Sequence, residues 1–311
     1  MENFEGPEKK LEVILSAPQT GLRDNTDRRW DRVVRACGAE IIKRECAAKL
    51  DSYLLSESSL FVWNDRILLI TCGKTTPTKA LPIILKYVAK PQIAYLFYER
   101  KNLNFPNEQP TDVDDDLAYL RTHFPGNSIR LGPACGDHLH VFYYAKPNGC
   151  PLPDTSVQIL MHDIDPAVAT TFYYDSTDID RQNDMLTRLK TLYPAMKVEN
   201  HFFYPQGYSL NGISEDNYFT IHVTPQPEAS YVSFESNMFN HESAGVVQKI
   251  ISLFNPLRFS VVLTATTKGQ FEHLHNGVMV EPPGYQAIDQ TFCEFDHHYT
   301  TIFSNFLKQR H

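Results

Sequence analysis

Paired apolar runs joined by short polar turns constrain the fold of this chain most strongly. One pair flanks Asn64-Asp65, and a second pair, residues 208–213 and 218–224, flanks residues 214–217. Asn and Asp favour the tight turns that connect antiparallel strands. Strand-like runs outnumber helical ones, and the helical ones fall between groups of hairpins. This order predicts an α+β fold built on antiparallel sheets rather than a doubly wound parallel sheet.

The first hairpin places two reactive side chains close together. If Asn64-Asp65 is a two-residue loop, Cys72 lies opposite Glu57 and next to Ser58. A one-residue slip of the register changes the face of the sheet on which these side chains lie, but it preserves their proximity.

The second hairpin brings a serine opposite a histidine. With Glu215-Asp216 as the loop, Ser209 lies directly opposite His222, with Cβ atoms about 5 Å apart. With Asp216-Asn217 as the loop the two side chains still share a face diagonally, whereas a three-residue loop puts them on opposite faces.

Residues 53–62 combine the composition of a buried strand with a polar centre, Ser-Glu-Ser-Ser at 56–59. A strand in a core avoids such side chains, because a buried polar group costs free energy unless it is hydrogen-bonded. The pattern alone favours a loop between two short strands, or an edge strand with one solvent-facing side. The other interpretation is one buried strand with a polar interruption that marks a functional site.

Apolar stripes with helical spacing predict helices over residues 25–39, 76–89, 115–124, 181–193 and 244–254. No linker or low-complexity tract separates domains. A chain of 311 residues can bury a large core, as one domain or as two closely packed halves. The order of strand pairs and helices recurs loosely in residues 10–160 and 200–307.

The composition limits the partners and the location of the protein. Its formal net charge of −8 argues against nucleic acid or an anionic membrane as the main partner. No apolar run approaches the ~20 residues of a membrane span. The acidic segment 1–5 lacks the apolar region of a signal peptide. We therefore predict a cytoplasmic protein.

Motifs for nucleotides, disulfides and metals are weak or absent. The sequence contains neither GxGxxG nor the GxxxxGKS/T loop. The six cysteines form no CxxC pair, which predicts free, mostly buried thiols. His-x-His occurs at 138–140 and 273–275, and Asp296-His297-His298 follows, but no third ligand has a fixed spacing. We predict no bound metal.

Two further pairs of residues are candidates for a site. Glu5 and Glu8, three apart beside a Gly-Pro turn, are suited to acid–base chemistry, although such a segment is also typical of a solvated lead-in. Phe4 and Phe203 lie near polar motifs and could stack on a planar ligand.

Ser58, Ser209 and His222 are the candidate nucleophiles and base. A serine–histidine pair across a hairpin is compatible with a hydrolase, but the chain has no Gly-x-Ser-x-Gly elbow. A serine in a strained strand, preceded by a carboxylate, can instead attack its own peptide bond. That reaction would cut the chain and leave a modified N-terminus.

Taken together, these residues resemble those of the eukaryotic-type S-adenosylmethionine decarboxylases. The resemblance covers nearly the whole chain and rests on segments 4–9 (FEGPEK), 55–62 (LSESSLFV), 71–73 (TCG), 97–102 (FYERKN), 163–167 (DIDPA), 207–211 (GYSLN) and 220–225 (TIHVTP). It implies a single domain over residues 1–311, folded as a four-layer α/β-β/α sandwich of two antiparallel sheets flanked by helices.

The resemblance also implies an enzyme that makes its own cofactor. Ser58 would attack the Glu57 carbonyl, a base would remove the Ser58 Cα proton, and β-elimination would cut the chain into residues 1–57 and 58–311. The larger piece would begin with a pyruvoyl group and stay with the smaller one as a heterodimer, which leaves a homodimer of heterodimers open. The pyruvoyl ketone forms a Schiff base with the amine of S-adenosylmethionine and accepts the electrons released as CO2 leaves. The product is the aminopropyl donor for spermidine and spermine synthesis.

The same resemblance implies roles for single residues. Cys72 matches the family's proton donor, and Glu5 and Glu8 match carboxylates of the active site. Ser209 and His222 match residues that serve self-cleavage. The positions that match substrate contacts are Phe4, Glu57, Phe203 and Gln226. The two phenylalanines match the pair that encloses the adenine.

Two departures from the family pattern affect the expected properties. Gln226 replaces a glutamate that holds the ribose hydroxyls, so it hydrogen-bonds without charge assistance. Some members bind putrescine as an activator at an acidic site, which Glu12, Asp154 and Glu235 match in part. The Lys, Ser, Glu and Phe that complete this site in animal members are replaced by Ile70, Glu99, Gln158 and Thr264. We expect weak or no activation by putrescine.

Two other functions stay open at this point. Gln226 is compatible with a pyruvoyl decarboxylase of another amino acid, although the retained Phe4 and Phe203 argue against it. A non-catalytic homologue that regulates an active partner should have lost the self-cleaving serine or the proton donor, and Ser58 and Cys72 are both present.

Overall fold

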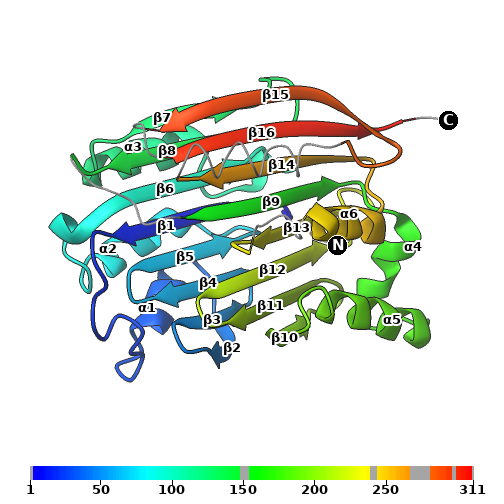
Figure 1. The fold of residues 1–311 in the computed structure, drawn as a ribbon, viewed down its shortest axis with the longest axis horizontal. Coiled ribbons are helices and arrows are strands. Elements are labelled where there is room, and N and C mark those ends of the chain that lie inside the picture. The colour runs from blue at the N-terminus through cyan, green and yellow to red at the C-terminus, as the bar shows by residue number, and fades with distance from the viewer. Residues whose placement is uncertain (1–2, 148–153, 239–243, 267–280, 296–298, 310–311) are drawn as a thin grey trace. The chain divides into compact units, whose positions relative to one another are not determined.

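The computed structural model describes residues 3–147, 154–238, 244–266, 281–295 and 299–309. The chain divides into two compact units, each built on one sheet of eight antiparallel strands (Figure 1). Unit 1 comprises Met1–Leu131 and His138–Pro151, and unit 2 comprises Gly132–Asp137 and Leu152–His311.

The sheet of unit 1 is covered on one face by helices α1 (Arg29–Ala36), α2 (Leu81–Ile84) and α3 (Val113–His123). Alternate strand residues such as Leu11 and Val13 pack against these helices in a single apolar core, as the two-residue period of a strand requires. In spatial order the strands are β2 (Ile41–Cys46), β3 (Leu50–Leu55), β4 (Ser58–Trp63), β5 (Arg66–Thr71), β1 (Lys9–Leu15), β6 (Ile93–Lys101), β8 (Leu139–Ala145) and β7 (Asn127–Leu131).

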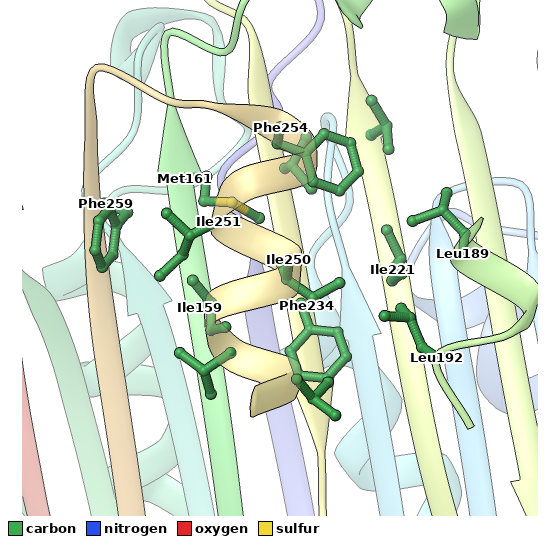
Figure 2. Close-up of a cluster of buried hydrophobic side chains, with 14 of the residues drawn as sticks. Ile159, Met161, Leu189, Leu192, Ile221, Phe234, Ile250, Ile251, Phe254 and Phe259 are labelled. Atoms are coloured by element: carbon green, nitrogen blue, oxygen red, sulfur yellow. The ribbon is translucent and has the colours of Figure 1, made fainter. Parts of the chain in front are cut away.

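The sheet of unit 2 packs one face against α4 (Pro166–Ala169), α5 (Ile179–Lys190) and α6 (Ala244–Phe254). Figure 2 shows side chains of α6, among them Ile250 and Phe254, lying over this face of the sheet. In spatial order the strands are β10 (Lys197–Phe202), β11 (Tyr208–Ser214), β12 (Asn217–Thr224), β13 (Tyr231–Ser236), β9 (Thr155–His162), β14 (Arg258–Ala265), β16 (Tyr299–Lys308) and β15 (Tyr285–Phe295).

The two sheets share one topology. Each position in the sheet of unit 2 is occupied by the strand whose number is eight higher than in unit 1. The loose recurrence noticed in the sequence therefore corresponds to a repeated strand order. The predicted α+β fold with two antiparallel sheets is confirmed.

The interpretation of residues 53–62 as one interrupted strand is wrong. Strands β3 and β4 form a hairpin in which Leu55 pairs with Ser58, so Ser56-Glu57 is a two-residue turn. The polar centre therefore lies at a chain reversal between two short strands, the interpretation that the pattern alone favours. A turn explains the polar residues, because its backbone groups lie outside the ladder of hydrogen bonds.

The continuous helix predicted over residues 76–89 is also wrong. A 3₁₀ turn at Pro77–Ala80 leads into α2, which is only four residues long. Pro82 lies in the first turn of α2. A proline has no backbone N–H and is tolerated only at a helix start, so the apolar spacing alone overstated the helix length.

Two smaller expectations also differ from the structure. Strand β10 was not predicted, because its residues are mostly polar and half-buried and form no apolar run.

The five cysteines in the described ranges are all free thiols. Only Cys37 and Cys72 among them are buried, so the prediction of mostly buried thiols is wrong. No helix among the described residues is long and apolar enough to cross a membrane.

Candidate active site

The corner formed by strands β3, β4 and β5 brings Ser58 and Cys72 into contact. Ser58 pairs with Thr71, as expected for a loop at Asn64-Asp65. The backbone N–H of Cys72 donates to the Glu57 carbonyl oxygen at 3.2 Å. The Ser58 hydroxyl donates to Cys72 Sγ at 3.4 Å, and both side chains are buried. The proximity predicted from the hairpin is confirmed.

Ser58 has a strained backbone. Its φ angle is 110°, whereas the other described non-glycine residues with positive φ lie between 46° and 57°. Those smaller angles belong to the left-handed helical region, but 110° lies outside it for a residue with a Cβ. Such conformations cost on the order of 1–3 kcal/mol and persist only where the surroundings impose them. The strain falls on the residue that follows the Glu57–Ser58 peptide bond.

Burial sets the protonation of two acidic groups at this corner. Burial raises the pKa of Glu57 to about 7, against a small opposing effect of Lys9. Glu57 Oε2 is buried and accepts no hydrogen bond within the described part of the chain. Burial, and then the charge of Glu57, raise the pKa of the Cys72 thiol well above its usual value. The thiol therefore keeps its proton at neutral pH.

Glu5 is part of this corner rather than a solvated lead-in. Its carboxylate accepts the backbone N–H groups of Asn104 and Phe105 at 2.8 and 2.6 Å. Its carbonyl oxygen accepts the N–H of Gly73 at 2.8 Å. Burial raises the pKa of Glu5, and the two N–H donors oppose this effect. Glu8 is half-buried, and its charge also raises the pKa of Cys72.

Lys9 supports the same corner and was not singled out in the sequence. Its Nζ donates to the carbonyl oxygen of Gly73 at 2.9 Å and to Gln109 Oε1 at 2.8 Å. Burial, reinforced by the positive charge of Arg100, lowers the pKa of Lys9 to about 8. One feature of the sequence could have identified it: Lys9 begins a strand in which the residues on the same side, such as Leu11, are apolar.

A cavity of about 220 Å³ opens at this corner within unit 1. It is lined by Asn3, Phe4, Glu5, Glu57, Gly73, Lys74, Phe105, Glu108 and Gln109. A Cβ on Gly73 would lie 2.6 Å from Glu57 Oε2 and 3.1 Å from Phe4 Cε2, so only glycine fits there without displacing these groups. The cavity combines an aromatic ring with carboxyl groups, which suits a planar or cationic ligand.

Ser209 and His222 form a second group, in unit 2. They pair directly across strands β11 and β12, with Glu215-Asp216 as the loop, which confirms the first of the registers considered. Ser209 Oγ lies 3.0 Å from His222 Nδ1. Burial lowers the pKa of His222 to about 3, so the imidazole is neutral and can accept a proton.

Phe203 and Gln226 also lie in unit 2. Phe203 is half-buried at the end of β10, and its ring meets that of His201 edge-on with centroids 4.8 Å apart. Its N–H donates to the carbonyl oxygen of Gly207, a glycine with a φ of 128°. Gln226 is half-buried just beyond β12. The predicted site residues therefore form two groups, one in each unit.

The histidine pairs do not assemble a metal site in the described residues. The rings of His138 and His140 lie edge-on with centroids 5.0 Å apart. No group of three or more His, Cys, Asp or Glu side chains in that part of the chain is arranged to hold an ion. Residues 273–275 and 296–298 lie outside the described ranges.

Comparisons with known proteins place this chain in a family. The family model for adenosylmethionine decarboxylase matches residues 1–307. An S-adenosylmethionine decarboxylase proenzyme of Leishmania donovani is 32% identical over 339 residues, covering 98% of this chain and 86% of the relative. The proenzyme of Xenopus laevis is 30% identical over 321 residues, covering 98% and 95%.

A solved structure gives the same result. The crystal structure of the Trypanosoma brucei AdoMetDC-delta26 monomer matches with a TM-score of 0.64 and 27% identity, over 81% of this chain and 99% of that one. The chain therefore belongs to the adenosylmethionine decarboxylase family.

Proposed function

We propose that this chain is a proenzyme that cuts itself between Glu57 and Ser58 and then decarboxylates S-adenosylmethionine. The observation that carries the proposal is the strained Ser58, whose φ is 110° and whose hydroxyl lies 3.4 Å from the Cys72 thiol. A nucleophile, the carbonyl it attacks and a protonated thiol thus occupy one buried corner.

Self-cleavage begins with the Ser58 hydroxyl. Its oxygen bonds to the Glu57 carbonyl carbon as the peptide C–N bond breaks, and the hydroxyl proton ends on the released nitrogen. The result is an ester between the two residues. The Cys72 N–H, 3.2 Å from the Glu57 carbonyl oxygen, is placed to stabilise the negative charge that develops there. The reaction also relieves the backbone strain at Ser58.

A base completes the cut, and we assign this step to His222 with Ser209. Removal of the Ser58 Cα proton forms a Cα–Cβ double bond and breaks the ester C–O bond, which leaves Glu57 as a carboxylate. Water then hydrolyses the dehydroalanine, so that ammonia leaves and the chain from residue 58 begins with a pyruvoyl ketone. Burial lowers the pKa of His222 and so keeps its imidazole neutral, which leaves one ring nitrogen with a lone pair for the proton.

The corner fits such a group. It is buried and borders a cavity, and Gly73 leaves space beside Glu57 that a Cβ would fill. When present, the pyruvoyl ketone supplies an electron sink for the pair released with CO2. Cys72 would return a proton to the substrate α-carbon, which its raised pKa permits. Glu5 and Glu8 would supply negative charge near the amine and sulfonium of the substrate.

Substrate binding follows from the same residues. Phe4 and Glu57 line the cavity of unit 1 and are assigned to the substrate, and the family resemblance assigns Phe203 to the adenine. Gln226 is assigned to the ribose hydroxyls. The product is the aminopropyl donor for spermidine and spermine synthesis. We further propose that the pieces 1–57 and 58–311 remain associated after the cut, and that the enzyme is cytoplasmic.

One experiment tests the proposal. The purified protein is resolved on a denaturing gel, the pieces are weighed by mass spectrometry, and CO2 release is measured from carboxyl-labelled S-adenosylmethionine. We expect two chains that meet at Glu57–Ser58, together with CO2 release. An uncut chain, or two chains inactive on this substrate, would refute the proposal. Cut but inactive chains would favour a pyruvoyl decarboxylase of another amino acid.

Substitution of Gly73 by alanine is expected to weaken substrate binding. The new Cβ would crowd Glu57 Oε2 and the Phe4 ring, so we expect a several-fold higher KM. The matched control is Gly21→Ala, since Gly21 also has a positive φ but no atom within 4 Å of the added Cβ. Both variants should lose about 1–2 kcal/mol of unfolding free energy from backbone strain. Equal KM values in the two variants would contradict the assignment.

Putrescine is expected to activate the processed enzyme weakly or not at all. The Glu12 carboxylate is already paired with Arg66, and Glu99 is paired with Lys10 at 3.0 Å. The chain's own cations thus neutralise carboxylates that a diamine would otherwise bind. The check is CO2 release with putrescine against sodium chloride at equal ionic strength. A several-fold rise specific to putrescine would show this expectation to be wrong.

A further inference from the structure

A chain of hydrogen bonds leads from His222 away from Ser209. His222 Nε2 lies 2.8 Å from Thr220 Oγ1, and Thr220 Oγ1 lies 2.8 Å from Asn211 Oδ1. Asn211 pairs directly with Thr220 across β11 and β12, and Ser209 pairs with His222 two residues further along. All four side chains therefore share one face of the sheet. Each is at most 6% exposed.

The donors and acceptors in this chain determine the tautomer of the imidazole. Asn211 Oδ1 can only accept, so the single hydroxyl proton of Thr220 is directed to it. The Leu210 carbonyl oxygen, 3.2 Å from Thr220 Oγ1, is a second acceptor for the same proton. With its proton directed to these two oxygens, the Thr220 oxygen accepts from His222 Nε2, which therefore carries a proton. Because a neutral imidazole has only one N–H, Nδ1 is left with a lone pair. That lone pair accepts the Ser209 hydroxyl at 3.0 Å.

We propose that Thr220 and Asn211 are positioning residues that hold His222 as its Nε2–H tautomer, so that the basic nitrogen is Nδ1, beside Ser209. This inference rests on the proposed role of His222 in self-cleavage and names the nitrogen that receives the proton. In the opposite tautomer the Nδ1–H donates to the Ser209 oxygen, and Nδ1 has no lone pair for a proton.

The hydroxyl of Thr220 is the part that matters. Thr220→Val keeps the shape of the side chain but removes the oxygen that accepts the Nε2–H hydrogen bond, and losing a buried hydrogen-bond partner is costly. We expect self-cleavage of freshly made proenzyme to slow about 10- to 100-fold, in the range seen when partners that orient a functional histidine are removed. Thr220→Ser restores an oxygen at this position and should recover most of the rate.

A matched control separates this effect from the loss of any buried hydroxyl. Thr301 lies in the same sheet, is 3% exposed, and its Oγ1 is 2.9 Å from Thr264 Oγ1. Thr301→Val should cleave at the rate of the unaltered chain. Thermal unfolding of both valine variants checks that they fold. Equal rates for Thr220→Val and Thr301→Val would overturn the inference.

Nuclear magnetic resonance reads the tautomer directly. Long-range proton–nitrogen spectra of histidine-labelled Ser58→Ala protein, which stays uncut, should show His222 protonated at Nε2. Adding Thr220→Val should shift the proton toward Nδ1. A proton on Nδ1 in Ser58→Ala itself would overturn the inference, whether or not the Thr220 variants fold.

The two proposals fail in different ways. If His222→Ala cleaves at the normal rate, His222 is not the base, and the proposed self-cleavage mechanism fails. If His222→Ala stays uncut while Thr220→Val cleaves at the normal rate and keeps Nε2–H, only the role of Thr220 and Asn211 fails.

Discussion

Replacement of Ser58 by alanine is expected to leave a single uncut chain with no decarboxylase activity. The substitution removes the hydroxyl that would attack the Glu57 carbonyl, and with it the side chain that would become the pyruvoyl group. Without that ketone, the electrons released with CO2 have no acceptor. The expected losses are therefore complete, and the denaturing gel and the CO2 assay check them separately.

The neighbouring serine Ser56 is the matched control. It lies in the same turn, and its Oγ accepts the N–H of Glu40 at 3.0 Å. Ser56→Ala removes a hydroxyl two residues away and keeps the hydroxyl of Ser58, so it should still yield two chains that meet at Glu57–Ser58. Two chains from Ser58→Ala, or activity in its uncut chain, would contradict the proposed cofactor.

Replacement of Cys72 by alanine is expected to separate self-cleavage from decarboxylation. The backbone N–H that donates to the Glu57 carbonyl oxygen survives the substitution, so the chain should still be cut. The proton donor is lost, and a positioned donor contributes about 10²- to 10⁴-fold to a rate. We expect kcat for CO2 release to fall by that factor, measured on fully processed enzyme.

Thiol reactivity provides a second test of Cys72. Burial raises its pKa well above the usual value, so little thiolate exists at neutral pH and alkylation by iodoacetamide should be slow. Cys46 and Cys135, which are exposed, should react faster than Cys72 and without loss of activity. Cys135→Ser is thus the matched control for Cys72→Ala. An unchanged kcat in Cys72→Ala would exclude the thiol as proton donor.

Local pattern was enough to predict the two residue pairs at the centre of the site. Glu57 with Cys72, and Ser209 with His222, are joined by hairpins with two-residue loops. Such a loop determines the partner of every residue along both strands, since pairing proceeds one residue at a time. The roles of these residues required the resemblance to a family as well.

Long-range contacts were beyond the sequence pattern. Glu5 is held by Asn104 and Phe105, about a hundred residues away, and nothing near Glu5 signals those donors. The same holds for Lys9, which reaches Gln109. These contacts arise because β1 lies between β5 and β6 in the sheet, although neither strand follows β1 directly in the sequence.

The sequence by itself determined the antiparallel fold class and the residues that face each other across the hairpins at 64–65 and 215–216, because these depend on neighbours in the chain. Only the tertiary structure decided that 56–57 is a turn, that Ser58 is strained and that His222 Nε2 lies 2.8 Å from Thr220 Oγ1. Backbone strain and proton placement depend on groups that packing brings together, and no local pattern encodes them.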